Sequence, residues 1–295
     1  MNPATYISMS TVRLLCGSNG VSVSVGTGFF YLVEIDTPEG KGNFPLVFTN
    51  KHVVNGHNEI RITVTTRSSS DDVSELVVAP GDVHRTFLIP NCQQRIVFHP
   101  DADVDLCAFY VGDVFEAVQN SGLFIRNTFL HKNFLVPHDE RKNVRAIEPI
   151  MMIGYPNGLW DEHNNRPLAR RGSTASHPFL KWNGRQEFVI DAACFPGSSG
   201  SPVFLFEDIM FRTKDNSYTP GARAQLLGVL ASGPLFTNEG TLVQRDIPTA
   251  TAIVPVVPSM MSLGNVVHAD ALQKVIDLAS AASVEGRTFA RAISV

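Results

Sequence analysis

The stretch IDAACFPGSSGSPVF (190–204) runs from one apolar segment through a Gly/Ser-rich turn into a second apolar segment. Apolar segments of this kind are typical of β-strands, and the Gly, Ser and Pro residues between them are typical of a tight turn. Ser199 is the serine followed directly by a glycine. A serine placed in this way exposes its Oγ, and the amides of Gly197 and Ser199 are suited to bind an oxyanion, as acyl transfer requires. A plain Gly/Ser hairpin turn is the alternative interpretation.

Short runs rich in β-branched and aromatic residues extend outward from this turn in both directions. We expect strands at 21–25, 28–35, 44–50, 59–66, 75–79, 95–98, 105–111, 148–156, 170–177, 186–193, 201–206, 224–232 and 250–256. Turn residues separate these runs at close intervals, and strands do not alternate with helices. The pattern therefore predicts an all-β protein and argues against a doubly wound parallel sheet.

The strands fall into two groups, separated by a mixed, charged segment at 112–145 that we interpret as a connection. We predict an N-terminal β-half with a short, loose N-terminal arm (1–116), a linker (117–146), a C-terminal β-half (147–258) and a C-terminal helix and tail (259–295). The helix is expected over 269–286, where an apolar face is formed by Leu272, Val275, Ile276 and Ala279. Two β-halves side by side predict a cleft between them.

Charge and cysteine content restrict the partners and the compartment. The 24 Lys and Arg residues are outnumbered by 28 Asp and Glu, so no basic excess is available for nucleic acid or an anionic membrane. The four cysteines show no CxxC spacing, and the N-terminus shows no signal-peptide pattern. We expect a cytoplasmic protein with reduced, mostly buried thiols and no membrane span.

A histidine and an acid accompany the serine. His52 lies in VFTNKHVV (47–54), where an apolar strand gives way to a turn, although most histidines are plain surface or core residues. Asp101, Asp103 and Asp105 all have the same strand parity, so alternation does not separate them. Asp105 is favoured because it directly precedes the apolar run LCAFYV, and an acid that orients a histidine must be shielded.

The chain order of these residues is His, Asp, Ser, as in the chymotrypsin arrangement. An α/β-hydrolase would need G-x-S-x-G and a histidine after the serine. Here Ser201 replaces the final glycine, and the one histidine that follows is His268, ahead of the expected helix. The hydrolase alternative is therefore disfavoured.

Several motifs together resemble those of trypsin-like serine peptidases, most closely the protease domain of HtrA-type proteases. They are TNKHVV (49–54), DLCAF (105–109), IGYP (153–156), RRGSTAS (170–176) and the opening stretch at 190–204. The resemblance covers about residues 20–258, and we expect no PDZ domain after it. It implies two six-stranded antiparallel β-barrels with the active site between them and a C-terminal α-helix beyond. His52, Asp105 and Ser199 would form the triad of a serine endopeptidase that works through an acyl-enzyme, with no cofactor or metal.

The chain departs from the family pattern at two positions. Ser198 replaces an aspartate that, in digestive relatives, pairs with a newly cut N-terminus, so activation by such cleavage is not expected. Ser201 replaces a glycine, a small change. Alignment of the motifs places Ala193, Ser232, Gly233 and Ala252 around the S1 pocket. Because no acid lies at its base, we expect small or apolar P1 residues.

Two hypotheses from different classes follow. The favoured one is an active endopeptidase acting on protein or peptide substrates. The alternative is a catalytically silent protease-fold module that binds or senses, and the long loops at 157–170 and 207–223 keep it open. The sequence leaves open whether an activating partner is needed.

Overall fold

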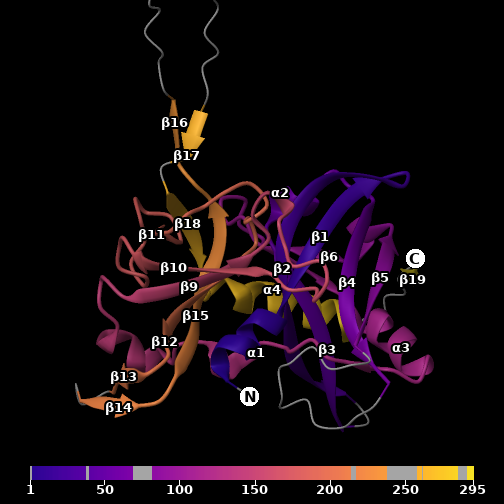
Figure 1. Ribbon diagram of the computed structural model, residues 1–295, viewed down its shortest axis with the longest axis horizontal. Helices are drawn as coiled ribbons and strands as arrows, with labels where there is room; N and C mark the ends of the chain where they lie inside the picture. The colour runs from indigo at the N-terminus through magenta and orange to yellow at the C-terminus, as the bar shows by residue number, and fades with distance from the viewer. Residues whose placement is uncertain are drawn as a thin grey trace, which may run out of the picture.

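A computed structural model of the chain describes residues 2–37, 40–68, 82–213, 217–237, 258–260, 262–284 and 291–295. Two β-rich halves lie side by side, with the N-terminal half on the right and the C-terminal half on the left in Figure 1. The predicted all-β architecture is confirmed.

The N-terminal half is built on one nine-stranded sheet among the described residues. Its strands, in spatial order, are β19 (Ile293–Ser294), β5 (Val83–Pro90), β4 (Glu59–Arg67), β1 (Thr11–Ser18), β2 (Val21–Thr37), β3 (Gly40–Thr49), β7 (Cys107–Tyr110) and β6 (Ile96–Phe98), with β8 (Phe124–Ile125) beside β4. The runs expected at 21–25 and 28–35 form the single strand β2. The strand expected at 75–79 lies outside the described residues.

The C-terminal half is a closed six-stranded barrel. Its strands, in spatial order, are β10 (Leu168–Thr174), β11 (Glu187–Asp191), β18 (Leu263–His268), β15 (Arg223–Ser232), β12 (Pro202–Glu207) and β9 (Pro149–Gly154). Five of them match expected runs. The sixth, β18, lies beyond residue 258, and the run expected at 250–256 lies outside the described residues.

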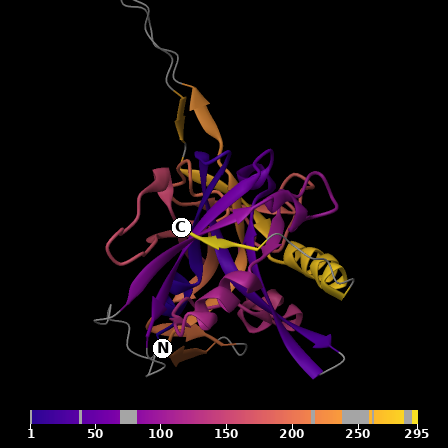
Figure 2. The ribbon, with the colours of Figure 1, turned by 90° about the vertical axis from the view of Figure 1, so that its right-hand side faces the viewer.

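Two small hairpins extend from this barrel. One pairs β13 (Met210–Arg212) with β14 (Tyr218–Pro220), and the other pairs β16 (Leu235–Thr237) with β17 (Pro258–Met260). The β16–β17 hairpin projects away from the body of the molecule in two perpendicular views (Figures 1 and 2).

The helices are α1 (Pro3–Met9), α2 (Lys51–Val54), α3 (Gly112–Asn120) and α4 (Ala271–Val284), and the 3-10 turns are η1 (Cys92–Gln94), η2 (Lys132–Phe134), η3 (His138–Asn143) and η4 (Pro156–Gly158). Helix α4 confirms the expected amphipathic helix, and all four residues of its predicted apolar face are buried. It contacts β6 and β7 of one half and β18 of the other.

Two helices differ from expectation. The N-terminal arm is not loose, because α1 is capped by the Asn2 side chain and buries Ile7 and Met9. Helix α3 occupies the start of the segment interpreted as an irregular connection. It buries Val114 and Val118, which are four residues apart and so lie on one face.

The largest hydrophobic cluster joins the two halves. It combines side chains of β2, β3 and β7 with side chains of β9, β12, β15, β18 and α4. Phe29 and Phe48 stack on one side of this cluster, with ring centroids 5.6 Å apart. Burial of this shared apolar surface fixes the two halves against each other.

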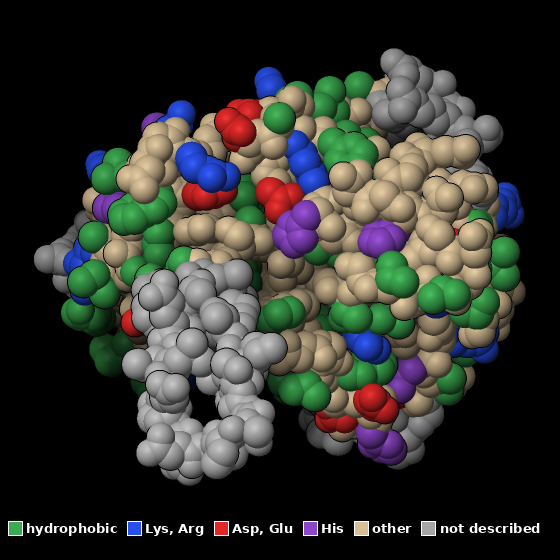
Figure 3. Space-filling view, turned by 90° about the horizontal axis from the view of Figure 1, so that it is seen from above, with side chains coloured by type: hydrophobic (Ala, Val, Ile, Leu, Met, Phe, Trp, Pro, Cys, Tyr) green, Lys and Arg blue, Asp and Glu red, His purple; other side chains and the backbone are tan. Residues whose placement is uncertain are grey.

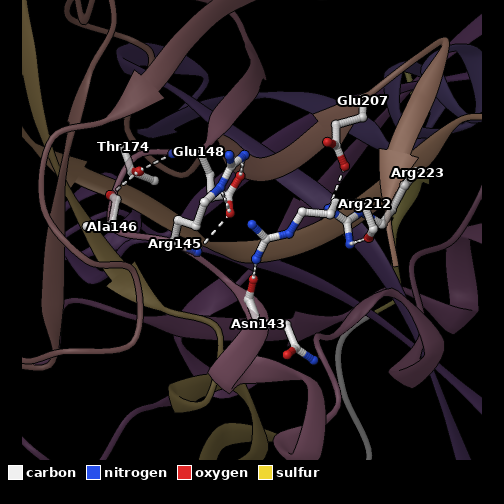
Figure 4. A network of polar contacts seen from close by, with 8 residues as sticks. All are labelled: Asn143, Arg145, Ala146, Glu148, Thr174, Glu207, Arg212 and Arg223. Carbon is white, nitrogen blue, oxygen red and sulfur yellow. Dashed lines mark hydrogen bonds and ion pairs between the residues drawn. The ribbon is translucent and has the colours of Figure 1, made fainter. Parts of the chain in front are cut away.

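Ion pairs and hydrogen bonds tie the end of the linker to the C-terminal barrel (Figure 4). The buried Glu148 carboxylate accepts hydrogen bonds from the backbone N–H and the guanidinium of Arg145. Arg212 donates to the carbonyl of Asn143 at 2.8 Å, and Thr174 of β10 donates from Oγ1 to the carbonyl of Ala146 at 2.6 Å. These contacts fix the point where the chain enters β9.

Candidate active site

His52 and Asp105 contact each other through two groups of the histidine. The imidazole Nδ1 lies 2.5 Å from Asp105 Oδ2, and the backbone N–H of His52 donates to Oδ1 at 3.2 Å. The carboxylate therefore fixes both the ring and its main chain. With Nδ1 protonated toward the carboxylate, Nε2 is left as the proton acceptor.

The local fold explains why the two residues meet. Strand β3 ends at Thr49, and one helical turn, α2, places His52 just past the strand end. Asn50 donates from Nδ2 to the carbonyl of Asp105 at 2.7 Å, which joins this strand end to the segment before β7. Half of the His52 side chain stays exposed, whereas 28% of the Asp105 side chain is exposed.

The two competing acids take part in other contacts. Asp101 and Asp103 are exposed, and the Asp101 side chain accepts from the backbone N–H of Asp103 at 2.9 Å. Lys51 donates to the carbonyl of Asp101. Within the part of the chain that the structure describes, neither side chain is hydrogen-bonded to His52, so Asp105 alone of the three orients the imidazole.

Ser199 reaches the same region from the C-terminal barrel. The backbone N–H of Thr27 donates to the carbonyl of Ser199 at 2.9 Å. A Cβ added to Gly200 would lie 1.9 Å from the Thr27 carbonyl oxygen and 2.6 Å from Thr49 Oγ1, so the backbone approaches the end of β3 closely. The Ser199–Gly200 backbone thus packs against β2 and against the end of β3, the strand that leads into His52. On the face seen in Figure 3, histidine and acidic side chains lie next to each other near the centre.

The turn before Ser199 aims its amides. Ser198 N–H donates to the carbonyl of Phe195 at 3.0 Å, with Pro196 second and Gly197 third in the turn, and Gly197 has φ +83°. This is the pattern of a type II turn. The carbonyl of Pro196 accepts from Asn157 N–H at 2.5 Å. Because a trans peptide points its C=O and following N–H in opposite directions, the Gly197 N–H points away from Asn157.

The amides of Gly197 and Ser199 donate no hydrogen bond to any residue that the structure describes. They are therefore available to an oxyanion. Within the same described ranges, Ser199 Oγ is not hydrogen-bonded to His52. In enzymes without substrate this bond is often long and shortens only when substrate binds.

The residues predicted for S1 lie beside this turn. Ala193 is exposed, and the exposed Ser232 accepts a hydrogen bond from Asn265 Nδ2 at 3.0 Å. A Cβ on Gly233 would lie 2.8 Å from the Leu263 carbonyl oxygen of β18 and 3.8 Å from Cys194 Cβ, so Gly233 packs closely between that strand and the loop. Ala252 lies outside the described residues.

Two neighbours of this region were not predicted. Asn265 was missed because the strand signal of β18 is short and begins beside a glycine. Arg170 was missed because it is distant in sequence: it comes from β10, and its Nη1 donates to the Ala193 carbonyl. The one sequence signal at Arg170 is that it is the first residue of the motif RRGSTAS (170–176).

Other reactive groups do not compete with Ser199. Burial raises the pKa of the Cys194 thiol to about 11, so this neighbour is protonated at neutral pH and a poor nucleophile. All four cysteines are free and buried. Among the described residues, no three His, Cys, Asp or Glu side chains are grouped so as to hold a metal ion. No described helix combines the length and the apolar character needed to cross a membrane.

Comparison with known proteins gave a family match and several solved structures. Residues 26–208 match the sequence model of the family described as "Trypsin-like peptidase domain". A serine-to-alanine mutant of Rv3671c from M. tuberculosis H37Rv, in its inactive form, is 17% identical, with a TM-score of 0.43 over 95% of this chain and 91% of that one. The serine endoprotease from Yersinia pestis is 12% identical, with a TM-score of 0.46 over 96% of this chain and 68% of that one. No curated protein matches.

Proposed function

Because the chain belongs to the trypsin-like peptidase family and has its fold, we propose that it is an active serine endopeptidase with the triad His52, Asp105 and Ser199. The observation that carries this proposal is the double contact of Asp105 with the ring and backbone of His52, next to the turn that bears Ser199. Protein or peptide substrates follow from the family.

In the proposed reaction, His52 Nε2 takes the proton of Ser199 Oγ as that oxygen attacks the peptide carbonyl. The imidazolium that forms is stabilised by Asp105. The carbonyl oxygen becomes an oxyanion and accepts hydrogen bonds from the amides of Gly197 and Ser199. The C–N bond then breaks, and His52 delivers the proton to the leaving amine.

The acyl-enzyme is hydrolysed by the same groups in reverse roles. His52 takes a proton from water, the hydroxide attacks the ester carbonyl, and the proton returns to Ser199 Oγ as the acid product leaves. No step calls for a group beyond the chain's own residues and water.

We further propose that S1 accepts small or apolar P1 residues. This is supported by the uncharged set Ala193, Ser232 and Gly233, and by the Arg170 guanidinium against the Ala193 carbonyl, which disfavours a cationic P1 side chain. A peptide library with each residue at P1 tests it. Cleavage confined to sites after Lys or Arg would contradict the proposal.

A fluorophosphonate probe tests the enzyme proposal, because it reacts only with an activated serine. We expect labelling of wild type and none of Ser199→Ala, together with loss of peptide hydrolysis of about 10⁶-fold. Ser176→Ala is the matched control and should leave both signals unchanged. Labelling that survives Ser199→Ala would refute the assignment of the nucleophile.

A silent binding module is the second candidate. It is favoured by the lack of a hydrogen bond between Ser199 and His52 within the described ranges. This candidate predicts that folded wild type binds peptides, as measured by calorimetry, without being labelled.

We also propose a cytoplasmic location, because all four thiols are free, and cell fractionation tests it.

A further inference from the structure

The loop from Ala193 to Ser199 is hydrogen-bonded to the rest of the chain in its middle and toward Ser199, but hardly at its start. In the middle, Asn157 N–H donates to the Pro196 carbonyl and Thr27 Oγ1 donates to the Gly197 carbonyl at 2.9 Å. Toward the nucleophile, Ser199 and Gly200 are fixed by backbone bonds to Thr27 and Leu230. At Ala193 and Cys194, by contrast, the backbone makes a single hydrogen bond within the described part of the chain. Its donor is the side chain of Arg170.

Arg170 contacts this loop at three points. Its Nη1 donates to the Ala193 carbonyl and lies 3.4 Å from Ser198 Oγ. Its guanidinium also lies over the Phe195 ring, with Cζ 5.2 Å from the centroid. One rigid, planar group thus joins the start, the middle and the end of the turn that aims the amides of Gly197 and Ser199.

The guanidinium has no carboxylate partner among the described residues, although the site partly removes it from water. Burial accordingly lowers its pKa, because desolvation disfavours the charged form. The cost of desolvating this positive charge without a carboxylate partner is offset by its contacts with the Ala193 carbonyl, the Ser198 hydroxyl and the Phe195 ring.

We propose that Arg170 is a positioning residue, which holds the Ala193–Ser199 loop so that the amides of Gly197 and Ser199 point at the oxyanion. Strand β10 supports it, since Arg170 lies opposite Met152 within the closed barrel. Arg170 acts through the loop and does not touch the reacting atoms. The proposal rests on the proposed peptidase function.

The neighbouring Arg171 provides a matched control. Successive side chains of a strand point to opposite faces, and Arg171 is exposed and paired with Asp208. Arg171→Met removes the same chemical group from the same strand without touching the loop.

The test measures how the rate of inactivation by a fluorophosphonate depends on probe concentration in wild type, Arg170→Met, Arg170→Lys and Arg171→Met. This dependence gives the maximal inactivation rate and the half-saturating probe concentration separately. For Arg170→Met we expect the maximal rate to fall about 10- to 100-fold with half-saturation changed less than threefold, because a small misplacement of oxyanion donors acts on the transition state. Arg170→Lys keeps the charge and one donor nitrogen but not the planar fork, so its maximal rate should lie between those of wild type and Arg170→Met.

The outcomes separate this proposal from the one on which it rests. An unlabelled wild type refutes the peptidase function. If wild type is labelled and the maximal inactivation rates of Arg170→Met and Arg171→Met are both within twofold of its rate, the positioning role is refuted and the peptidase function is not. If Arg170→Met does not fold, as judged by circular dichroism, Arg170→Lys decides: a maximal rate equal to that of Arg171→Met overturns the proposal.

Discussion

Asp105 accepts two hydrogen bonds from one residue, which sets both the tautomer and the position of His52. An amide in its place would keep the shape, but its NH2 group cannot accept a hydrogen bond. The imidazole would then be driven toward the tautomer in which Nε2 carries the proton and no longer accepts one from Ser199.

Asp105→Asn is therefore expected to lower the turnover of a peptide substrate by about 10⁴-fold, with little change in thermal stability. Steady-state hydrolysis measures it. Asp103→Asn, two residues away and exposed, should stay within twofold of wild type. Equal losses in both variants would mean that Asp105 is not the orienting acid.

At the scale of residues, the motifs led to the proposal of His52, Asp105 and Ser199, whereas contacts that depend on packing were missed. Strand alternation could not separate Asp101, Asp103 and Asp105. The expected burial favoured Asp105, which is the one that contacts His52. Arg170 and Asn265 reach the loop from strands far away in the chain, and a side-chain contact of this kind has no local signal.

The turn at 195–199 is the element on which the proposed chemistry depends. Gly197 has φ +83°, and a Cβ there would lie 2.5 Å from the carbonyl oxygen of Tyr155. A side chain would thus be both strained and obstructed by backbone, which would rotate the Gly197 amide away from the oxyanion.

Gly197→Ala should lower the free energy of unfolding by more than the roughly 1 kcal/mol of conformational strain and reduce fluorophosphonate labelling at least tenfold. Gly184→Ala is the control: Gly184 has φ +81°, but a Cβ there meets no atom within 4 Å. We expect that variant to lose the strain energy alone and to label as wild type. Denaturant unfolding and labelling rates measure both effects, and equal behaviour of the two variants would contradict this account of the turn.

At the scale of elements, hydrophobic periodicity predicted a helix correctly where the helix was long. Helix α4 spans 14 residues, and its apolar face was predicted correctly. The shorter α1 and α3 were missed, although Asn2 before Pro3 is a helix-start signal and Val114 and Val118 have helical spacing. Few turns give few repeats, so a strand-rich background obscures them.

Among the described residues, His99 and His268 are buried, and burial lowers the pKa of both side chains, so the charge state of each affects stability. His268 is 8% exposed, its Nε2 has no partner within the described residues, and burial lowers its pKa below the usual value near 6.5. Around it lie Phe188, Asp270, Arg141 and the backbone of Leu180 and Glu187. The aspartate and the two backbone groups raise its pKa, and the arginine lowers it. Desolvation is the largest of these effects.

The unfolded chain therefore binds a proton at His268 at a higher pH than the folded chain does. The resulting stability is complete above about pH 6.5 and is lost as the pH falls from there toward the folded-state pKa. We expect the melting temperature of wild type to fall more between pH 7.5 and 5.5 than that of His268→Gln. His138→Gln, at an exposed position, should follow wild type, and parallel curves for all three would contradict the argument.

At the scale of the whole molecule, the grouping of strands predicted two β-halves, and the structure confirms them. The hydrophobic cluster shared by both halves was not predictable, because apolar runs do not say which neighbour they face. The same limit explains β18, which closes the barrel although its pattern is too short to separate from the segment before α4.

We propose that Ser199 is an activated nucleophile between the two halves. Ser198 and Ser201 lie on the same turn, so the most direct measurement is peptide mass spectrometry of wild type after reaction with a fluorophosphonate. We expect one adduct per chain, located on Ser199 and absent after His52→Ala. A folded protein that carries no adduct, or an adduct on Ser198, Ser201 or any other residue, would contradict it.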